Sequence, residues 1–273
     1  MPILFSLSAV LCWGCSDFLG GYASRKSDAY LITAITNGCG LCVIGAVCVL
    51  SGAASPPRAA MLWALAAGAS GGTALALFYR ALSVGNMGLT APVTALLAAG
   101  IPTLVGIAME GWPHVSQVVG FLLAGAAIWL VSRSESGFSP QGIGLAILAG
   151  IGFAGFYLLI RQARVGSAFW IAAASRTAAF ACTAAIVAAG RRFGPLQRVN
   201  AGWAALAGCL DVGGSVLFVR ASQTGRLDTA VVLTSLYPVV TVVLARLILK
   251  EHFTRWKTVG MVAALAAVPL IAS

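Results

Sequence analysis

The chain alternates between long apolar stretches and short polar breaks along its whole length. Each apolar stretch has about 20 residues, the length that a helix needs to cross the hydrocarbon core of a bilayer. Charged residues, Gly-Pro clusters and short polar segments mark where the stretches end. The pattern predicts ten membrane-spanning helices, which cover residues 2–22, 29–50, 59–80, 87–109, 115–132, 140–160, 166–189, 201–219, 229–249 and 256–272.

An internal repeat divides these spans into two groups. Residues 63–85 and 203–225 share nine identities in 23 ungapped positions, where this composition would give roughly two by chance. We therefore expect two repeats, residues 1–135 and 140–273, within one membrane domain. Each repeat holds five spans, and because five is odd, the second repeat must cross the bilayer in the opposite sense to the first. The expected fold is all-α and integral to the membrane, with two inverted five-helix repeats.

Composition excludes a soluble protein. Hydrophobic residues make up 60% of the chain and charged residues 9%, whereas soluble domains carry roughly 25% charged residues. The formal net charge of +10 comes from Lys and Arg in the loops, so no nucleic-acid partner is needed to explain it. Without Arg176, the loops that follow odd-numbered spans carry 11 Lys or Arg and the opposite side carries five. The positive-inside rule would then place both termini outside the cytoplasm.

The cysteines and histidines point to no catalytic or metal site. All seven cysteines lie inside predicted spans, so we expect no disulfides. Cys12 with Cys15 and Cys39 with Cys42 have spacings that a soft metal could use, but no His or Glu in a span accompanies them. The two histidines lie singly in loops, and an integral-membrane enzyme would need a cluster of catalytic groups. We expect neither an enzyme nor a cofactor.

Three ionisable residues fall in the middle of predicted spans: Asp17, Arg176 and Asp211. A charge at that depth costs about 2.5–3.5 kcal/mol on insertion scales, so it needs a partner or a water-filled cavity. One interpretation pairs Arg176 with Asp211 as a structural ion pair and leaves Asp17 bonded to nearby backbone. The other places both carboxylates in a cavity, where they would favour cationic or zwitterionic cargo and could carry a proton.

Helical spacing adds further candidates around the two carboxylates. Trp13 lies four residues before Asp17, and a ring beside a carboxylate suits an ammonium group. Ser215 lies four residues after Asp211 and shares its helix face. Tyr237 adds a hydroxyl next to Pro238.

Prolines and glycines mark candidate hinges. Pro92 and Pro102 in the fourth span and Pro238 in the ninth remove backbone donors, which predicts broken helices at matching places in the two repeats. Gly214 in the eighth span is compatible with a gate hinge, although close helix packing explains it as well. Glu110 closes the fourth span, where we expect a local salt bridge or a backbone cap.

Several motifs resemble the EamA family of the drug/metabolite transporter superfamily. They are Trp13-Gly14 with Asp17 to Gly21, Tyr79-Arg80-Ala81-Leu82 leading to Ala91-Pro92, Arg220-Ala221, Ser235-Leu236-Tyr237-Pro238, and Leu249-Lys250-Glu251. The resemblance implies a ten-helix secondary transporter with a central cavity lined by helices 1, 3, 4, 6, 8 and 9. Tyr79 joins the candidate cargo-binding residues on this ground. The resemblance also implies cytoplasmic termini, which conflicts with the charge count, so both orientations stay open.

The expected function is therefore secondary-active transport, by alternating access, of a small metabolite such as an amino acid or amine. Export is the expected direction, with proton coupling as an option, and the expected location is the cell membrane. The expected partners are a small-molecule substrate, the lipid bilayer, protons and a second copy of the chain. A multidrug or quaternary-amine efflux carrier is the alternative, followed by a channel or a structural membrane subunit.

Overall fold

The computed structural model describes residues 1–24, 27–84, 87–132, 140–194, 196–249 and 254–272. Within these ranges the side chains of residues 79, 82–84, 87–92, 131–132, 140–141, 242, 245–246, 249 and 272 are not described. In the described ranges every regular element is a helix. The helices are α1 (Pro2–Ser24), α2 (Ala29–Leu50), α3 (Arg58–Val84), α4 (Met87–Glu110), α5 (Val115–Ser132), α6 (Pro140–Gln162), α7 (Ala168–Ala189), α8 (Arg198–Thr224), α9 (Leu227–Thr234), α10 (Tyr237–Leu249) and α11 (Arg255–Ala272).

Length and hydropathy qualify seven of the described helices as membrane spans: α1, α2, α3, α4, α6, α7 and α8. Two shorter apolar stretches, Val115–Leu130 and Leu227–Thr241, add to them. The protein is therefore a multi-pass membrane protein, as the hydrophobic pattern predicts. Two helix starts follow directly from their residues. Pro2 opens α1, where a missing N–H is harmless, and Asp28 caps α2 by accepting from the backbone N–H groups of Tyr30 and Leu31.

The predicted ninth span is two helices rather than one. α9 ends at Thr234, and α10 begins at Tyr237 after a turn in which the Leu236 N–H donates to the Leu233 carbonyl at 3.2 Å. Pro238 explains the position of the break, because a proline ring clashes with the carbonyl four residues earlier, here that of Thr234. Pro238 itself lies in the first turn of α10, where it replaces a backbone donor that has no helical partner.

The predicted break in the fourth span is wrong. α4 runs without interruption through Pro92 and Pro102 to Glu110. Next to Pro102, the Thr103 hydroxyl donates to the Ala99 carbonyl at 2.7 Å, one turn earlier in the same helix. The two repeats therefore differ, since only the second has a broken helix among the described residues.

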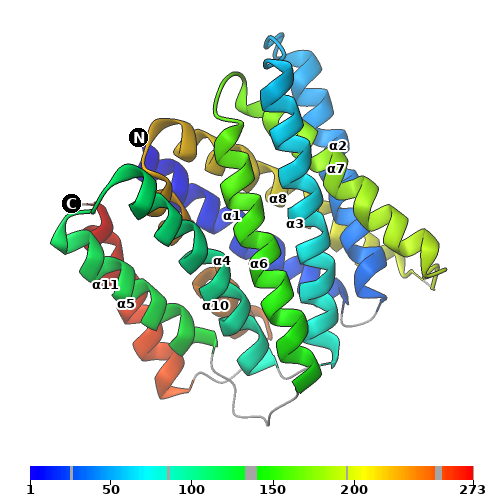
Figure 1. Ribbon diagram of the computed structural model, residues 1–273. Helices are drawn as coiled ribbons and strands as arrows, with labels where there is room; N and C mark the ends of the chain where they lie inside the picture. The colour runs from blue at the N-terminus through cyan, green and yellow to red at the C-terminus, as the bar shows by residue number, and fades with distance from the viewer. Residues whose placement is uncertain (25–26, 85–86, 133–139, 195, 250–253, 273) are drawn as a thin grey trace.

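Equivalent helices of the two repeats make equivalent contacts. α1 packs on α8 as α6 packs on α3, and α2 packs on α8 as α7 packs on α3. α6 contacts α4 as α1 contacts the α9–α10 pair. The remaining large contacts join equivalent helices across the interface, such as α5 with α11 at one edge and α2 with α7 at the other (Figure 1). This exchange is what two structural repeats around a pseudo-two-fold axis produce.

Two glycines at the repeat offset allow the closest helix crossings. A Cβ atom on Gly68 of α3 would lie 1.8 Å from the Ser175 carbonyl oxygen of α7. A Cβ atom on Gly208 of α8 would lie 2.2 Å from the Thr36 carbonyl oxygen of α2. These crossings bring α2 and α7 against the helices that surround the centre of the molecule, so both helices can reach the cavity described next.

Candidate functional site

A cavity of about 110 Å³ lies between the two repeats. Its walls come from α1, α2, α3, α4, α6, α7, α8, α10 and the turn before α10. This corrects the expected lining, which lacked the second and seventh spans. They reach the cavity through the glycine crossings and contribute Asn37 and Arg176.

The size of the cavity limits what it can hold. The cavity of about 110 Å³ has room for several waters or for a small solute.

The predicted residues meet in this cavity where their side chains are described. Asp17 and Trp13 reach it from α1, and Asp211 and Ser215 reach it from α8. Tyr237 reaches it from the start of α10. The Tyr79 side chain lies outside the described residues.

Arg176 holds the most connected position in the site. Its guanidinium forms an ion pair with the Asp211 carboxylate and donates to Asn37 Oδ1 at 2.6 Å and to Ser215 Oγ at 2.9 Å. Arg176 is 9% exposed, and its partners come from α2 of the first repeat and α8 of the second. The pair matches the structural alternative that the sequence left open, and it leaves these two residues without net charge.

Asp17 is the carboxylate that this network does not neutralise. It lines the cavity from α1 and is half-buried. Among the residues that the structure describes, none forms a hydrogen bond or ion pair with its carboxylate. With Arg176 and Asp211 paired, the charge of the described cavity lining is −1 when Asp17 is ionised. An unpaired carboxylate at this depth is a candidate binding or proton-carrying group.

An aromatic cluster forms one wall beside these charges. The Trp13 ring centroid lies 5.6 Å from that of Phe218 and 6.3 Å from that of Tyr157, and Phe156 extends the cluster at 5.5 Å from Tyr157. The Trp13 indole N–H donates to the Asp211 backbone oxygen at 3.2 Å, which fixes the ring at the edge of the cavity. The electron-rich faces of such rings attract cations.

Gly214 lets α8 pack closely against the Trp13 ring because it has no side chain. A Cβ atom at Gly214 would lie 2.6 Å from the Trp13 ring, and α8 passes through the position without a break. The geometry is that of close packing, so a hinge at Gly214 stays a prediction. Hinge roles for Pro92, Pro102 and Pro238 stay predictions too, although only Pro238 lies beside a helix break in the described chain.

The sequence interpretation missed Asn37, Phe156 and the role of Tyr157. Asn37 is 1% exposed in the second span, and a buried amide in an apolar helix is itself a signal that a polar partner lies nearby. Tyr157 stands 140 residues after Asp17, and Gly71 stands 140 residues before Asp211. All four line the cavity, so the site occupies equivalent places in the two repeats while its chemistry differs.

One buried donor at the cavity, the Arg176 Nε, has no hydrogen-bond partner in the described part of the chain. Buried polar atoms are nearly always satisfied, so this position favours a polar rather than a purely apolar occupant.

Comparison of the chain with protein-family models identifies its family. The model of the EamA-like transporter family matches residues 1–133 and again residues 140–273. The chain belongs to the EamA-like transporter family. The double match gives each repeat of this EamA chain its own family segment, with the cavity between them.

A solved structure shares the fold of this chain. A crystal structure with 17% sequence identity superposes with a TM-score of 0.78, covering 98% of this chain and 95% of the other. At that identity the likeness is one of fold alone. No curated protein matches the chain. EamA membership places the protein among transporters of the drug/metabolite transporter superfamily rather than among enzymes.

Proposed function

We propose that this EamA protein is a secondary-active carrier that exports a small amine or amino acid across the cell membrane by alternating access. α9 and α10 together form the ninth of ten spans in this proposal, so that each repeat has five spans and the repeats are inverted. The equivalent contacts of the two repeats support a carrier over a channel or a structural subunit, because the cavity lies between two bodies that can rock against each other.

The unpaired Asp17 carboxylate is the observation that carries the proposal. Arg176 is occupied by Asp211, so the ionised cavity lining keeps one negative charge. The aromatic wall that contains Trp13 stands beside it. A cationic ammonium group satisfies both features, since a carboxylate binds it by charge and the rings attract it by their faces.

The carboxylate of a zwitterionic cargo also has a candidate partner in the cavity. The Arg176 Nε is a donor without a partner among the described residues, and a carboxylate or carbonyl of the cargo would accept a hydrogen bond from it. Asp17 can also take up a proton when no cargo is bound, which would couple export to proton entry.

Quaternary-amine efflux is the second candidate. The cavity-lining rings of Trp13, Phe156 and Tyr157 favour it, because quaternary ammonium ions bind through ring faces without donating hydrogen bonds. The unpaired Nε of Arg176 would then have no role in cargo binding. Binding of primary amines and of tetramethylammonium therefore distinguishes the two candidates, since the first predicts a preference for the primary amine and the second a preference for tetramethylammonium.

Ligand-induced thermal stabilisation of the purified protein tests the proposal. We expect a set of small amines and amino acids to raise the midpoint of unfolding, and Asp17→Asn to abolish the rise. Asp28→Asn is the matched control, because Asp28 lies outside the cavity and pairs with Arg192 at a helix start. It should change the ligand response by less than about twofold. Equal responses in wild type and folded Asp17→Asn would contradict the role given to Asp17.

A further inference from the structure

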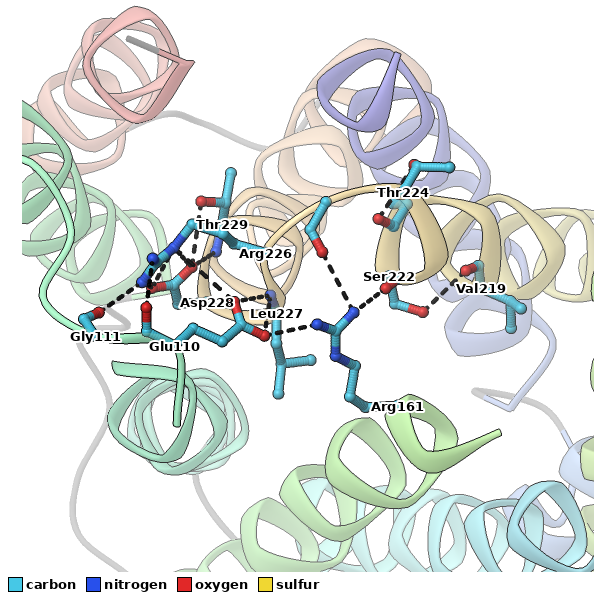
Figure 2. A network of polar contacts seen from close by, with 12 residues as sticks. Glu110, Gly111, Arg161, Val219, Ser222, Thr224, Arg226, Leu227, Asp228 and Thr229 are labelled. Atoms are coloured by element: carbon cyan, nitrogen blue, oxygen red, sulfur yellow. Dashed lines mark hydrogen bonds and ion pairs between the residues drawn. The ribbon is translucent and has the colours of Figure 1, made fainter. Parts of the chain in front are cut away.

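A second cluster of charges lies away from the cavity, at the end of the molecule where α4, α6 and α8 finish and α9 begins. We call it the terminal latch and define it as Glu110, Arg161, Arg226 and Asp228 (Figure 2). Both chain ends lie on this side. Gly225 is against Pro2, and Gln117 Nε2 donates to the Ile271 carbonyl at 3.4 Å.

Arg161 ties the end of α4 to the end of α8. Its Nη2 contacts Glu110 Oε1 at 2.7 Å, and its Nη1 donates to the Ser222 and Gly225 carbonyl oxygens. The carbonyl oxygens at the end of a helix have no partners within the helix. Arg161 therefore satisfies the C-terminus of α8 while it holds Glu110 of the other repeat.

Arg226 adds a second connection between the repeats. Its Nη2 contacts Asp228 Oδ2 at 2.7 Å and donates to the Gly111 carbonyl at 2.8 Å, and its Nη1 donates to the Glu110 carbonyl at 3.2 Å. The hydrogen bonds to Asp228 raise the pKa of Arg226, the charges of Asp228 and Glu110 add to the rise, and partial burial opposes it. The guanidinium therefore stays charged at physiological pH.

Glu110 also provides the cap that α9 lacks in its own sequence. The N-cap residue of α9 is Arg226, whose side chain forms no cap hydrogen bond. The Leu227 N–H instead donates to Glu110 Oε2 at 3.2 Å, and the Thr229 N–H donates to Asp228 Oδ1 at 2.6 Å. The expected cap at Glu110 thus exists, but it caps a helix of the other repeat. Carboxylates at this position also complement the positive end of the helix dipole.

An apolar layer separates the latch from the cavity. Ile160, Val219, Leu227 and Val231 are each at most 2% exposed and belong to one buried cluster with the cavity residues Tyr157 and Trp13. Leu227 is the residue that Glu110 caps, so α9 links the latch to this layer directly. The same helix ends at the turn that carries the cavity residue Ser235.

Three of the four latch residues have no charged equivalent at the 140-residue offset in the first repeat. These three second-repeat residues are charged, whereas the residues 140 positions earlier are neutral. These pairs are Arg161 and Gly21, Arg226 and Asn86, and Asp228 and Gly88. A scaffold of two similar repeats whose two ends carry different charges should favour one of its two states.

We propose that the terminal latch holds the cavity closed on the side of the chain termini, and that its release, with displacement of α9, is the step that opens that side. The proposal rests on alternating access by this carrier. It assigns gating roles to Glu110 and Arg161, which lie outside the cargo cavity.

Thiol labelling of a buried reporter tests the latch. The reporter is Ala230→Cys in α9, which is 2% exposed, in a background where the seven native cysteines are replaced by alanine. The protein is held in lipid nanodiscs and treated with a charged methanethiosulfonate reagent. We expect Glu110→Ala to raise the labelling rate about 5- to 100-fold, the range of typical coupling free energies.

Asp28→Ala is the matched control, because Asp28 also pairs with an arginine and caps a helix, but at the other end of the molecule. It should leave the rate within about twofold of the parent. Arg161→Gln is measured alongside, since it removes the bridge and keeps the Glu110 cap on Leu227. A faster rate in both folded latch variants but not in the control supports the proposal.

An unchanged rate in folded Arg161→Gln overturns the latch, as does equal acceleration by Asp28→Ala. Folding is judged by size-exclusion elution and thermal unfolding. The labelling needs no cargo, so its result is independent of the proposed transport. Fast labelling without any flux would count against the carrier and leave the latch standing.

Discussion

Removing one partner of the Arg176–Asp211 ion pair should destabilise the protein strongly. Asp211→Ala leaves the Arg176 guanidinium in a site where it is 9% exposed, with hydrogen bonds to Asn37 and Ser215 but no counter-charge. Breaking a fully buried pair costs about 3–5 kcal/mol. The Asp211 side chain is 21% exposed to the cavity, so we expect a smaller loss of about 2–3 kcal/mol.

Thermal unfolding measures this loss. For a chain of this size, 2–3 kcal/mol corresponds to a fall in Tm of about 5–10 °C. The double variant Arg176→Met with Asp211→Ala should recover more than half of that fall, because it removes the unpaired charge as well. Arg192→Ala is the control, since the Arg192–Asp28 pair is 37% and 28% exposed and is worth at most about 1 kcal/mol. An Asp211→Ala protein as stable as wild type, or strictly additive losses in the double variant, would refute the reasoning.

Two further predictions concern close packing. Gly68→Ala should lower Tm through a loss of about 1–3 kcal/mol, because its Cβ would overlap the Ser175 carbonyl, whereas Gly45→Ala has open space at its Cβ and should leave Tm unchanged. Equal Tm values for the two variants would contradict the α3–α7 crossing. Phe218→Ala removes a ring that is fully buried in the aromatic wall, and should cost about 3–5 kcal/mol in thermal unfolding. A loss below about 1 kcal/mol would show that Phe218 is not packed against Trp13 as described.

The sequence predicts the membrane class, the repeat and most of the cavity for physical reasons. Apolar runs of about 20 residues have the length of a membrane-spanning helix, so they mark the spans directly. Charges in the middle of spans are so costly that Asp17, Arg176 and Asp211 could be singled out without a structure. The identity of the pair, Arg176 with Asp211, could be offered only as one of two alternatives, because hydropathy does not show which helix faces meet.

Other features depend on contacts that the sequence pattern does not contain. Pro102 and Pro238 both lie inside predicted apolar spans, so the sequence does not distinguish them. In the structure α4 continues through Pro102, whereas Pro238 lies in the first turn of a new helix. The terminal latch was not predicted, because its charges lie at helix ends, where charged residues are common. Counting spans would have placed Glu110, Arg161 and Arg226 on the same side of the membrane, and this is the signal that could have grouped them.

Counterflow in sealed proteoliposomes tests the central claim most directly. Vesicles loaded with an unlabelled amine or amino acid that binds the protein should transiently concentrate the labelled compound, because a carrier exchanges one cargo molecule for another. The same vesicles with Asp17→Asn should show no such overshoot. A labelled compound that only equilibrates, with ionic current through the protein, would indicate a channel, and an overshoot unaffected by Asp17→Asn would contradict the site proposed here.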